Sequence, residues 1–293
     1  MSNPAAREAA AERPELFYEP ESVPAEIRAA PKSLLTRLAD NTVLRKTLLL
    51  IVLAVLWEIY ARALDNALVL PTFSSTVVAM VSALASGELP QATAYTLGLL
   101  FKGYLAGLLI AAVLTAFASA TRLGADLLET LTAMFNPLPS IALLPLALIW
   151  FGLGEGSVIF VLIHAVLWAV ALNTHAGFRE VSRTLRMVGQ NYGLTGLRYV
   201  FRILIPGAFP SILTGLKIGW AFAWRTLIAA ELVFGSTSGS GGLGWYIFER
   251  KNQLLIPDVF AGLLTVILFG LLVENLVFKT IEKRTVSRWG MSN

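Results

Sequence analysis

The sequence contains no cysteine and only two histidines. Without cysteine there is no disulfide framework, no thiolate-bound metal or iron–sulfur cluster and no cysteine nucleophile. Two histidines are too few for a histidine-rich metal site, so we expect neither a metal nor another cofactor. Charged residues are also scarce, at 14% of the chain against about 25% in a typical soluble domain. This scarcity argues against a soluble enzyme.

Apolar residues are abundant instead. They make up 56% of the 293 residues, and the mean hydropathy is +0.69. This composition indicates a membrane protein with several transmembrane segments. In such a protein a net charge of +4 reflects basic residues in loops that stay in the cytoplasm. We therefore expect contact with a lipid membrane and no nucleic-acid partner.

Six apolar stretches are long enough to cross a hydrocarbon core of about 30 Å, which takes roughly 20 helical residues. Backbone polar groups in lipid must be satisfied within each segment, so helices are expected. The predicted fold class is an all-α integral membrane protein with six transmembrane helices. Their predicted spans are residues 47–64, 95–118, 130–151, 157–175, 208–234 and 258–279.

The sequence predicts three regions. Residues 1–46 form a cytoplasmic N-terminal tail, in which 32–46 has the pattern of an amphipathic surface helix. Residues 47–279 form the transmembrane domain, and 280–293 form a cytoplasmic C-terminal tail. Loop 176–207 is rich in arginine, whereas loop 65–94 has no Lys or Arg. The positive-inside rule therefore places loop 176–207 and both termini in the cytoplasm. The membrane that the chain crosses is expected to be the inner membrane of the cell.

Loop 176–207 has the pattern of short helices rather than of a plain connection. Gly193 and Gly196 are expected to break it, and Pro206 and Pro210 are expected to restart a helix. The result is a stiff, basic element below the membrane that fits a groove on a cytoplasmic partner. A surface helix held on anionic lipid by its arginines fits the same pattern.

Several sequence strings resemble those of ABC importer permeases. Gly193, followed thirteen residues later by Pro206, resembles their coupling motif, which is Glu-Ala-Ala, three residues, Gly and then a spaced Ile-x-Leu-Pro. The similarity extends over most of residues 50–288 and is to the type I, binding-protein-dependent branch that imports nitrate, sulfonates and taurine. The other strings that carry it are Trp57-Glu58, Leu70-Pro71, Pro139 to Leu146, Trp150 to Glu155, Asn173-Thr174, Ala229 to Glu231 and Gly242 to Gly244.

The resemblance implies a permease subunit that forms the path for a small anion by alternating access. It also implies a cytoplasmic ABC ATPase dimer, a second permease copy in a homodimer and an external substrate-binding protein. The chain has no G-x-x-x-x-G-K-[ST] string, so the ATPase is expected to be a separate polypeptide and this chain not to be an enzyme. The implied ATPase-coupling residues are Met187, Gly189, Gly193, Leu194 and Pro206. Met187 to Gly189 stand where the family often has Glu-Ala-Ala, so the usual acidic residue is absent.

Ionisable residues inside a membrane helix are costly and mark functional sites. Arg225 and Glu231 lie six residues apart, about 240° around a helix, so they do not share a face. Arg225 either lines the path and attracts an anion, pairs with Glu58 or another acid, or makes a contact between subunits. Lys102 and Lys217 lie closer to the ends of their helices and can reach water.

Prolines and glycines also distinguish individual helices. Pro137, Pro139 and Pro145 deform the helix at 130–151, and broken membrane helices line cavities or protein contacts. Gly103 and Gly107 lie four residues apart and predict close helix packing. Taken with the family strings, these features give the candidate translocation path, which consists of Pro139, Pro145, Asn173, Arg225 and Glu231.

Two other functions fit a chain of six membrane helices. A secondary carrier often has inverted repeats, and no repeat is detected here. An intramembrane serine hydrolase needs a serine and a histidine within reach of each other. His164 is available, but no serine elbow is evident near a membrane-embedded turn. Neither alternative requires the element between Gly193 and Pro206.

Overall fold

The computed structural model describes residues 42–234 and 241–288, which contain helices and no strand. The chain divides into two units, Met1–Ala54 and Val55–Asn293, and the second unit contains the candidate functional residues. The predicted N-terminal tail lies outside the described residues up to residue 41. Residues 42–46, expected to end an amphipathic surface helix, instead begin the first long helix.

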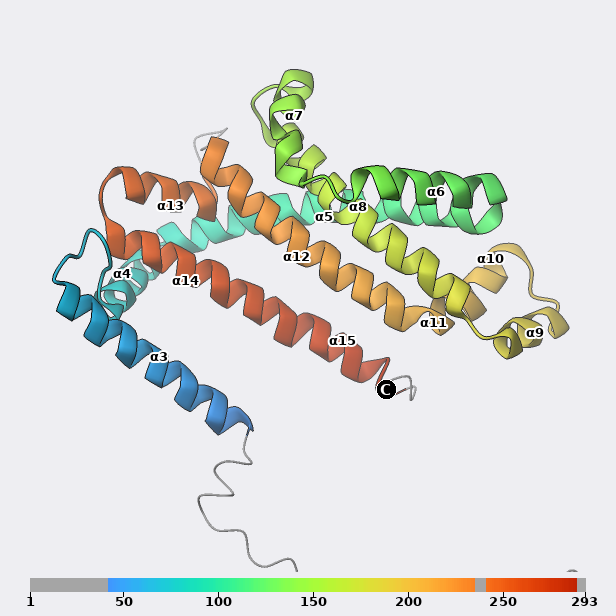
Figure 1. Cartoon of the computed structure of the whole chain (residues 1–293), viewed down its shortest axis with the longest axis horizontal. Coiled ribbons are helices and arrows are strands. Elements are labelled where there is room, and N and C mark those ends of the chain that lie inside the picture. Colours follow the sequence, from blue (N-terminus) through green and yellow to red (C-terminus); the bar gives the residue numbers. More distant parts are fainter. Residues whose placement is uncertain (1–41, 235–240, 289–293) are drawn as a thin grey trace, which may run out of the picture. The chain divides into compact units, whose positions relative to one another are not determined.

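Five long helices and several short ones make up the described chain (Figure 1). Two of the short elements, η2 and η3, are π-helices, and η1 is a 3₁₀-helix. In chain order they are α3 Thr42–Leu64, α4 Phe73–Ala85, α5 Glu88–Ala120, α6 Arg122–Phe135, η1 Ser140–Leu143, α7 Leu144–Phe151, α8 Glu155–Glu180, α9 Arg183–Asn191, α10 Gly196–Tyr199, η2 Val200–Leu204, α11 Ile205–Gly207, α12 Phe209–Phe234, α13 Leu243–Asn252, α14 Ile256–Leu272, η3 Val273–Phe278 and α15 Lys279–Arg284.

Four segments in the described part of the chain are long and apolar enough to cross a membrane: α3, α5, α8 and the run Ile256–Arg284. The number rises to six if each of two bent helix pairs counts as one span. The expectation of one helix over 130–151 is wrong, because α6 and the segment Ser140–Phe151 meet at 88°. The predicted proline distortion is confirmed, and it is a complete break.

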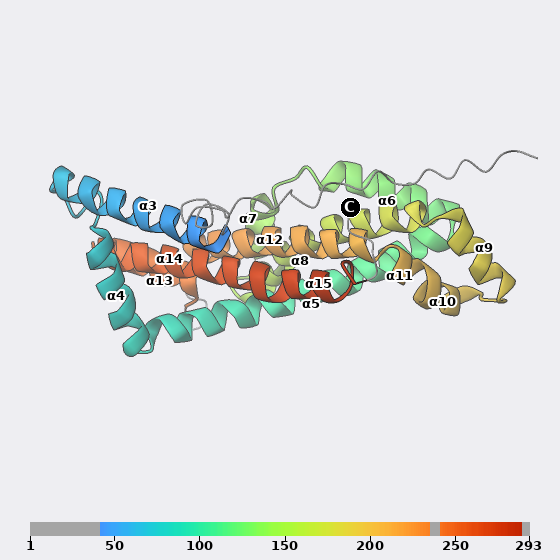
Figure 2. The ribbon, with the colours of Figure 1, turned by 90° about the horizontal axis from the view of Figure 1, so that it is seen from below.

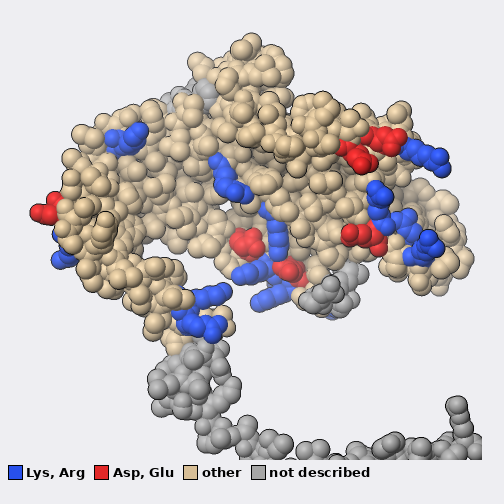
Figure 3. Space-filling model, viewed as in Figure 1, with Lys and Arg blue, Asp and Glu red and all other residues tan. Residues whose placement is uncertain are grey.

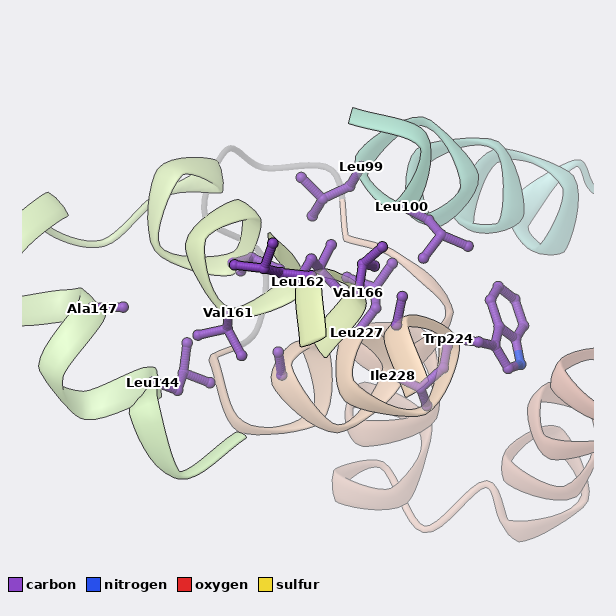
Figure 4. Packing of buried hydrophobic residues seen from close by; sticks show 14 of the residues in the cluster. Leu99, Leu100, Leu144, Ala147, Val161, Leu162, Val166, Trp224, Leu227 and Ile228 are labelled. Carbon is purple, nitrogen blue, oxygen red and sulfur yellow. The ribbon is translucent and has the colours of Figure 1, made fainter. Parts of the chain in front are cut away.

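Helices α5, α8 and α12 form the packed centre of the second unit, with α7 against it (Figure 4). The predicted close packing at Gly103 and Gly107 is confirmed on the α5–α8 contact. A Cβ added to Gly103 would lie 2.6 Å from Leu162 Cβ, and one added to Gly107 would lie 2.8 Å from Val166 Cβ. The two glycines thus let the two backbones approach each other.

The second unit has its short helices at opposite ends. Figures 1 and 2 both show α4 and α13 at one end and α9 and α10 at the other. At the α4 end, Trp57 Nε1 donates to Pro71 O (2.9 Å), and Glu58 Oε2 accepts from Ser74 N (2.9 Å). Two strings that are separate in the sequence, Trp57-Glu58 and Leu70-Pro71, therefore meet at the start of α4.

Candidate functional site

A cavity of about 320 Å³ lies where the chain breaks between α6 and η1. Proline cannot donate the backbone hydrogen bond that a continuous helix needs, and two prolines fall within the four residues of the break. Helix α8 lines a second side of the cavity and α12 lines a third. The lining residues are Asn136, Pro137, Leu138, Pro139, Ser140, Ile141, His164, Ala165, Trp168, Phe222, Arg225, Thr226 and Ala229.

Arg225 supplies the positive charge of this cavity. Its Nε donates to Ala221 O (3.0 Å) on its own helix, and its guanidinium carbon lies 5.3 Å from the centre of the Phe222 ring. Within residues 42–234 and 241–288 no carboxylate pairs with Arg225. The partner considered from the sequence, Glu58, instead bonds Arg62 and Ser74.

Two lysines in the membrane helices, Lys102 and Lys217, differ from Arg225 because each contacts an acidic side chain. Lys102 Nζ lies 2.7 Å from Glu155 Oε2, and Lys217 Nζ lies 2.7 Å from Glu282 Oε2. From the sequence both lysines were expected to reach water, whereas in the structure each forms an ion pair. Of these three cations, Arg225 is the one without an acidic partner among the described residues.

The polar residues of the lining also include Ser140, His164 and Trp168. Ser140 Oγ lies 3.1 Å from His164 Nδ1, which joins η1 to α8. Trp168, one turn further along α8, stacks on Phe135 at 5.5 Å and 11°. His164 Nε2 and Trp168 Nε1 are buried and have no hydrogen-bond partner among the described residues. These two nitrogens are enclosed by the surrounding side chains rather than open to the cavity.

The Ser140–His164 contact is not a catalytic triad. A serine hydrolase needs a third group that orients the histidine, and no carboxylate contacts His164 in the part of the chain that the structure describes. The serine also bonds Nδ1, so the ring's other nitrogen is left without an orienting partner.

Glu231 does not line the cavity. It is buried, accepts from Thr96 Oγ1 (2.9 Å) and from Gly244 N (2.9 Å), and Leu243 N donates in turn to Thr96 Oγ1 (2.8 Å). A carboxylate at a helix N-terminus satisfies free N–H groups and complements the helix dipole. Glu231 therefore fixes the start of α13 against α5 and α12.

Asn173 and Pro145 also lie away from the cavity lining. Asn173 Nδ2 donates to Ala169 O (2.7 Å) on its own helix, and its Cβ approaches Gly215, where an added Cβ would lie 2.9 Å away. It therefore belongs to the α8–α12 contact. Pro145 is exposed in the first turn of α7. Of the five path candidates, the structure brings Pro139 and Arg225 together.

Helix α9 ends at a turn that requires glycine. Gly193 has φ +66°, its N–H donates to Gln190 O (2.9 Å), and Leu194 N donates to Gly189 O (3.0 Å). This pair of bonds is the Schellman motif, in which the left-handed residue is usually glycine. The predicted break at Gly193 is confirmed, and α10 begins at Gly196.

The expectation that Pro206 restarts a helix is wrong. The segment Gly196–Gly207 is one helical run, and Pro206 lies near its end. The preceding turn is a π-helix in which Ile205 N donates to Val200 O, so the chain absorbs the hydrogen bond that proline cannot make. The run then meets α12 at 76°, and Pro210 stands in the first turn of α12.

Contacts at both ends join this short-helix element to the long helices. Arg186 of α9 donates to Phe178 O (2.6 Å) and Val181 O (3.1 Å), the carbonyl groups that end α8. Gly189 is buried against the following run, because a Cβ there would lie 2.9 Å from Ile203 Cγ1 and from Tyr199 Cε2. Helix α9 therefore contacts the end of α8 and the run Gly196–Gly207, which leads into α12.

The outer surface of this element is apolar and basic. Met187 is 54% exposed, Tyr192 81%, Leu197 74% and Phe201 65%. Figure 3 shows several Lys and Arg side chains at the right, near the end where Figure 1 labels α9 and α10. Exposed apolar side chains surrounded by charge are typical of a protein-binding surface.

Comparison with known proteins decides the family. Residues 103–286 match the family described as "binding-protein-dependent transport system inner membrane component". The chain belongs to this family. It is thus a multi-pass inner-membrane permease subunit of a transport system, and the matched region includes the cavity and the whole element α9–α11.

Named relatives place the permease more narrowly, in the ABC importer branch predicted from the sequence. A protein of Escherichia coli (strain K12) named for aliphatic sulfonates transport, SsuC, is 30% identical over 75% of this chain and 82% of its own. The taurine transport system permease protein TauC of the same strain is 33% identical over 54% of this chain and 56% of its own. The nitrate import permease protein NrtB of Synechocystis is 33% identical over 52% and 54%.

The sequence alone did not identify several residues that line the permease's cavity or join its helices. No sequence pattern marks the contact of Ser140 with His164 or the stacking of Trp168 on Phe135, because each joins residues 24 or more positions apart. Arg186 is one of five arginines in loop 176–207, and the sequence does not distinguish it from the other four. Thr96 was not singled out at all, although it joins two of the family strings through Glu231 and Leu243.

Proposed function

We propose that this permease is the membrane subunit of an ATP-driven importer that takes a small anion from an external binding protein. Two copies form the path, and two ATPases bind the surface of α9–α11 in the cytoplasm. Both termini lie on that side of the membrane. The relatives named for sulfonates, taurine and nitrate support an anionic substrate.

The observation that carries the proposal is the connection of α9 to the cavity. Arg186 joins α9 to the end of α8, and the run Gly196–Gly207 joins it to α12. Both α8 and α12 line the cavity. A partner that moves α9 therefore moves two walls of the cavity at once, which is what alternating access requires.

The surface chemistry supports a protein partner over anionic lipid alone. Lipid attracts the arginines of the loop, but it does not require a helix end held by a Schellman turn or an arginine that bonds two carbonyls. Met187, which stands where an acid is frequent in the family, makes this surface more apolar. The ATPase groove is accordingly expected to meet Met187, Tyr192 and Leu197 by apolar contact.

Arg225 supports the anionic substrate. A cation without a carboxylate partner in a membrane cavity raises the local concentration of anions. The break at Pro137 and Pro139 forms the opposite wall, so the path runs between this break and α12. Among the candidates, Asn173, Pro145 and Glu231 are then assigned to packing around the path rather than to its surface.

The proposal is tested first by purifying the tagged chain from its native membrane and identifying the proteins that accompany it. A stoichiometric ATPase is the expected result. A chain that remains alone after mild crosslinking would refute the proposal and favour a secondary carrier.

The coupling surface is tested by Gly193→Asp. Aspartate tolerates positive φ better than most residues, so the turn forms, but a carboxylate enters the ATPase contact. We expect normal membrane insertion and loss of nitrate, taurine or alkanesulfonate uptake. The matched control is Gly87→Asp, since Gly87 also has positive φ and no atom within 4 Å of an added Cβ. Equal uptake by both variants would refute the coupling assignment.

A further inference from the structure

The chain turns back on itself after α15. The backbone N–H and the hydroxyl group of Thr285 both donate to Ile281 O, at 3.0 and 2.6 Å. The next residue, Val286, is only 7% exposed and belongs to the same buried cluster as Leu213 of α12. Residues 279–288, called the C-terminal clasp below, are thus packed against α12.

An ion pair joins the clasp to α12 at a second point. Lys217 Nζ on α12 lies 2.7 Å from Glu282 Oε2 on α15, and the two side chains are 25% and 45% exposed. Ion pairs with this much exposure add little stability, and a lysine near a helix end can reach water without an acid. The apolar cluster therefore supplies the stability of this contact. Complementary charges fix the register of packed surfaces, so the ion pair sets how the clasp is oriented on α12.

The clasp contacts one particular stretch of α12. The run Gly196–Gly207 meets the start of α12 at an angle of 76°, and the α12 residues that line the cavity begin at Phe222. Leu213 and Lys217 lie between these two points. The clasp therefore holds the part of α12 that connects the short-helix element to the cavity.

Aromatic contacts continue from the clasp along α12. Phe278, directly before α15, meets the Trp220 ring edge-on at 6.3 Å and 65°. Trp220 in turn stacks on Trp224 at 6.5 Å and 6°, and Trp224 directly precedes Arg225 of the cavity lining. Phe278 also ends the π-helix η3, and π-helical turns are frequent at functional sites. The contacts thus extend from the clasp to the cavity wall.

We propose that Lys217 and Glu282 are positioning residues for transport. Their ion pair keeps the clasp and the first half of α12 together as one rigid body when the ATPases move the short-helix element. Helix α12 then moves as a unit, and the cavity changes the side from which it is accessible. This inference rests on the proposed function, and it adds that coupling depends on a contact outside α9–α11.

The test uses a single reporter in the cavity. The chain has no cysteine, so Leu138→Cys introduces one thiol at a lining residue that is 36% exposed. The permease–ATPase complex is reconstituted in sealed proteoliposomes, and a membrane-impermeant methanethiosulfonate is added outside with or without ATP and vanadate. ATP reaches only complexes whose ATPases face outward, so the response reports access from the cytoplasmic side. We expect nucleotide to change the labelling rate of the permease about fivefold or more, as is common for coupled sites.

Charge reversal in the Leu138→Cys parent separates positioning from stability. Lys217→Glu places like charges together and should abolish the nucleotide response. Glu282→Lys should do the same from the more exposed partner, and it replaces the first variant if that one does not fold. The double variant restores an ion pair of opposite polarity and should regain the response. The matched control is Lys283→Glu, at an exposed position of α15, which should keep the response of the parent.

Three results would overturn the inference. A full nucleotide response in Lys217→Glu and Glu282→Lys would refute it, even with a lowered Tm, because the pair would then be structural only. A double variant as impaired as the single ones would show that the ion pair is not the cause. A parent without any nucleotide response would refute the proposed coupling function itself, and that result is distinct because it precedes any change to Lys217 or Glu282.

Discussion

The α5–α8 contact gives a prediction whose size can be worked out from the structure. Helix α5 carries three glycines, and an added Cβ meets different surroundings at each. At Gly103 it would lie 2.6 Å from Leu162 Cβ, and at Gly107 it would lie 2.8 Å from Val166 Cβ and 3.3 Å from the Ile163 carbonyl oxygen. At Gly98 no atom lies within 4 Å.

These distances predict opposite effects of the same substitution. Overpacking a helix contact costs about 1–3 kcal/mol, while replacing glycine by alanine inside a helix returns about 1 kcal/mol. Gly103→Ala and Gly107→Ala should therefore each lose up to about 2 kcal/mol net, because at each site one of the close atoms is a Cβ, which a change of rotamer does not move away. Gly98→Ala should be neutral or stabilised by up to about 1 kcal/mol.

The assay is the apparent Tm of the detergent-solubilised chain, followed by fluorescence-detected size-exclusion chromatography after heating. At about 2–4 °C per kcal/mol, Gly103→Ala and Gly107→Ala should lower Tm by several degrees and Gly98→Ala should not. The double variant should lower it further, without strict additivity because the two sites are one turn apart. A Tm drop of the same size in Gly98→Ala would refute the packing argument.

Two further substitutions test contacts between the long and short helices. Arg186→Leu removes both hydrogen bonds to the end of α8, so the ATPase should remain bound and hydrolyse ATP while uptake falls severalfold. Arg183→Leu on the same helix is the control. An equal loss of uptake in both variants would contradict a specific role for the Arg186 bonds. Glu231→Gln weakens the hydrogen bonds at the α13 N-terminus, so it should lower the free energy of unfolding by about 1–3 kcal/mol, measured as a lower apparent Tm. The control is Glu249→Gln, at an exposed position, which should leave Tm unchanged. An unchanged Tm for Glu231→Gln would show that this junction does not stabilise the fold.

The sequence predicted those features that depend on local physics. Apolar runs of about 20 residues have few choices other than membrane helices, and most predicted spans correspond to observed helices. Gly193 could be placed at a helix end because positive φ favours glycine. The prolines marked the break at 136–139, although not its angle of 88°, since a local pattern does not fix where the chain turns.

Tertiary structure decided what each polar residue contacts. Glu231 was expected on the path, and its buried bonds to Thr96 and Gly244 come from segments 135 and 13 residues away. The contact between Ser140 and His164 spans 24 residues. Glu58, considered as a partner for Arg225, bonds Arg62 and Ser74 instead. Such pairings depend on how helices cross, which no single stretch of sequence encodes. Residue type alone thus indicated a membrane protein, its long helices and the short-helix element that ends at Gly193, whereas the packing of α5, α8 and α12 determined which charges are paired.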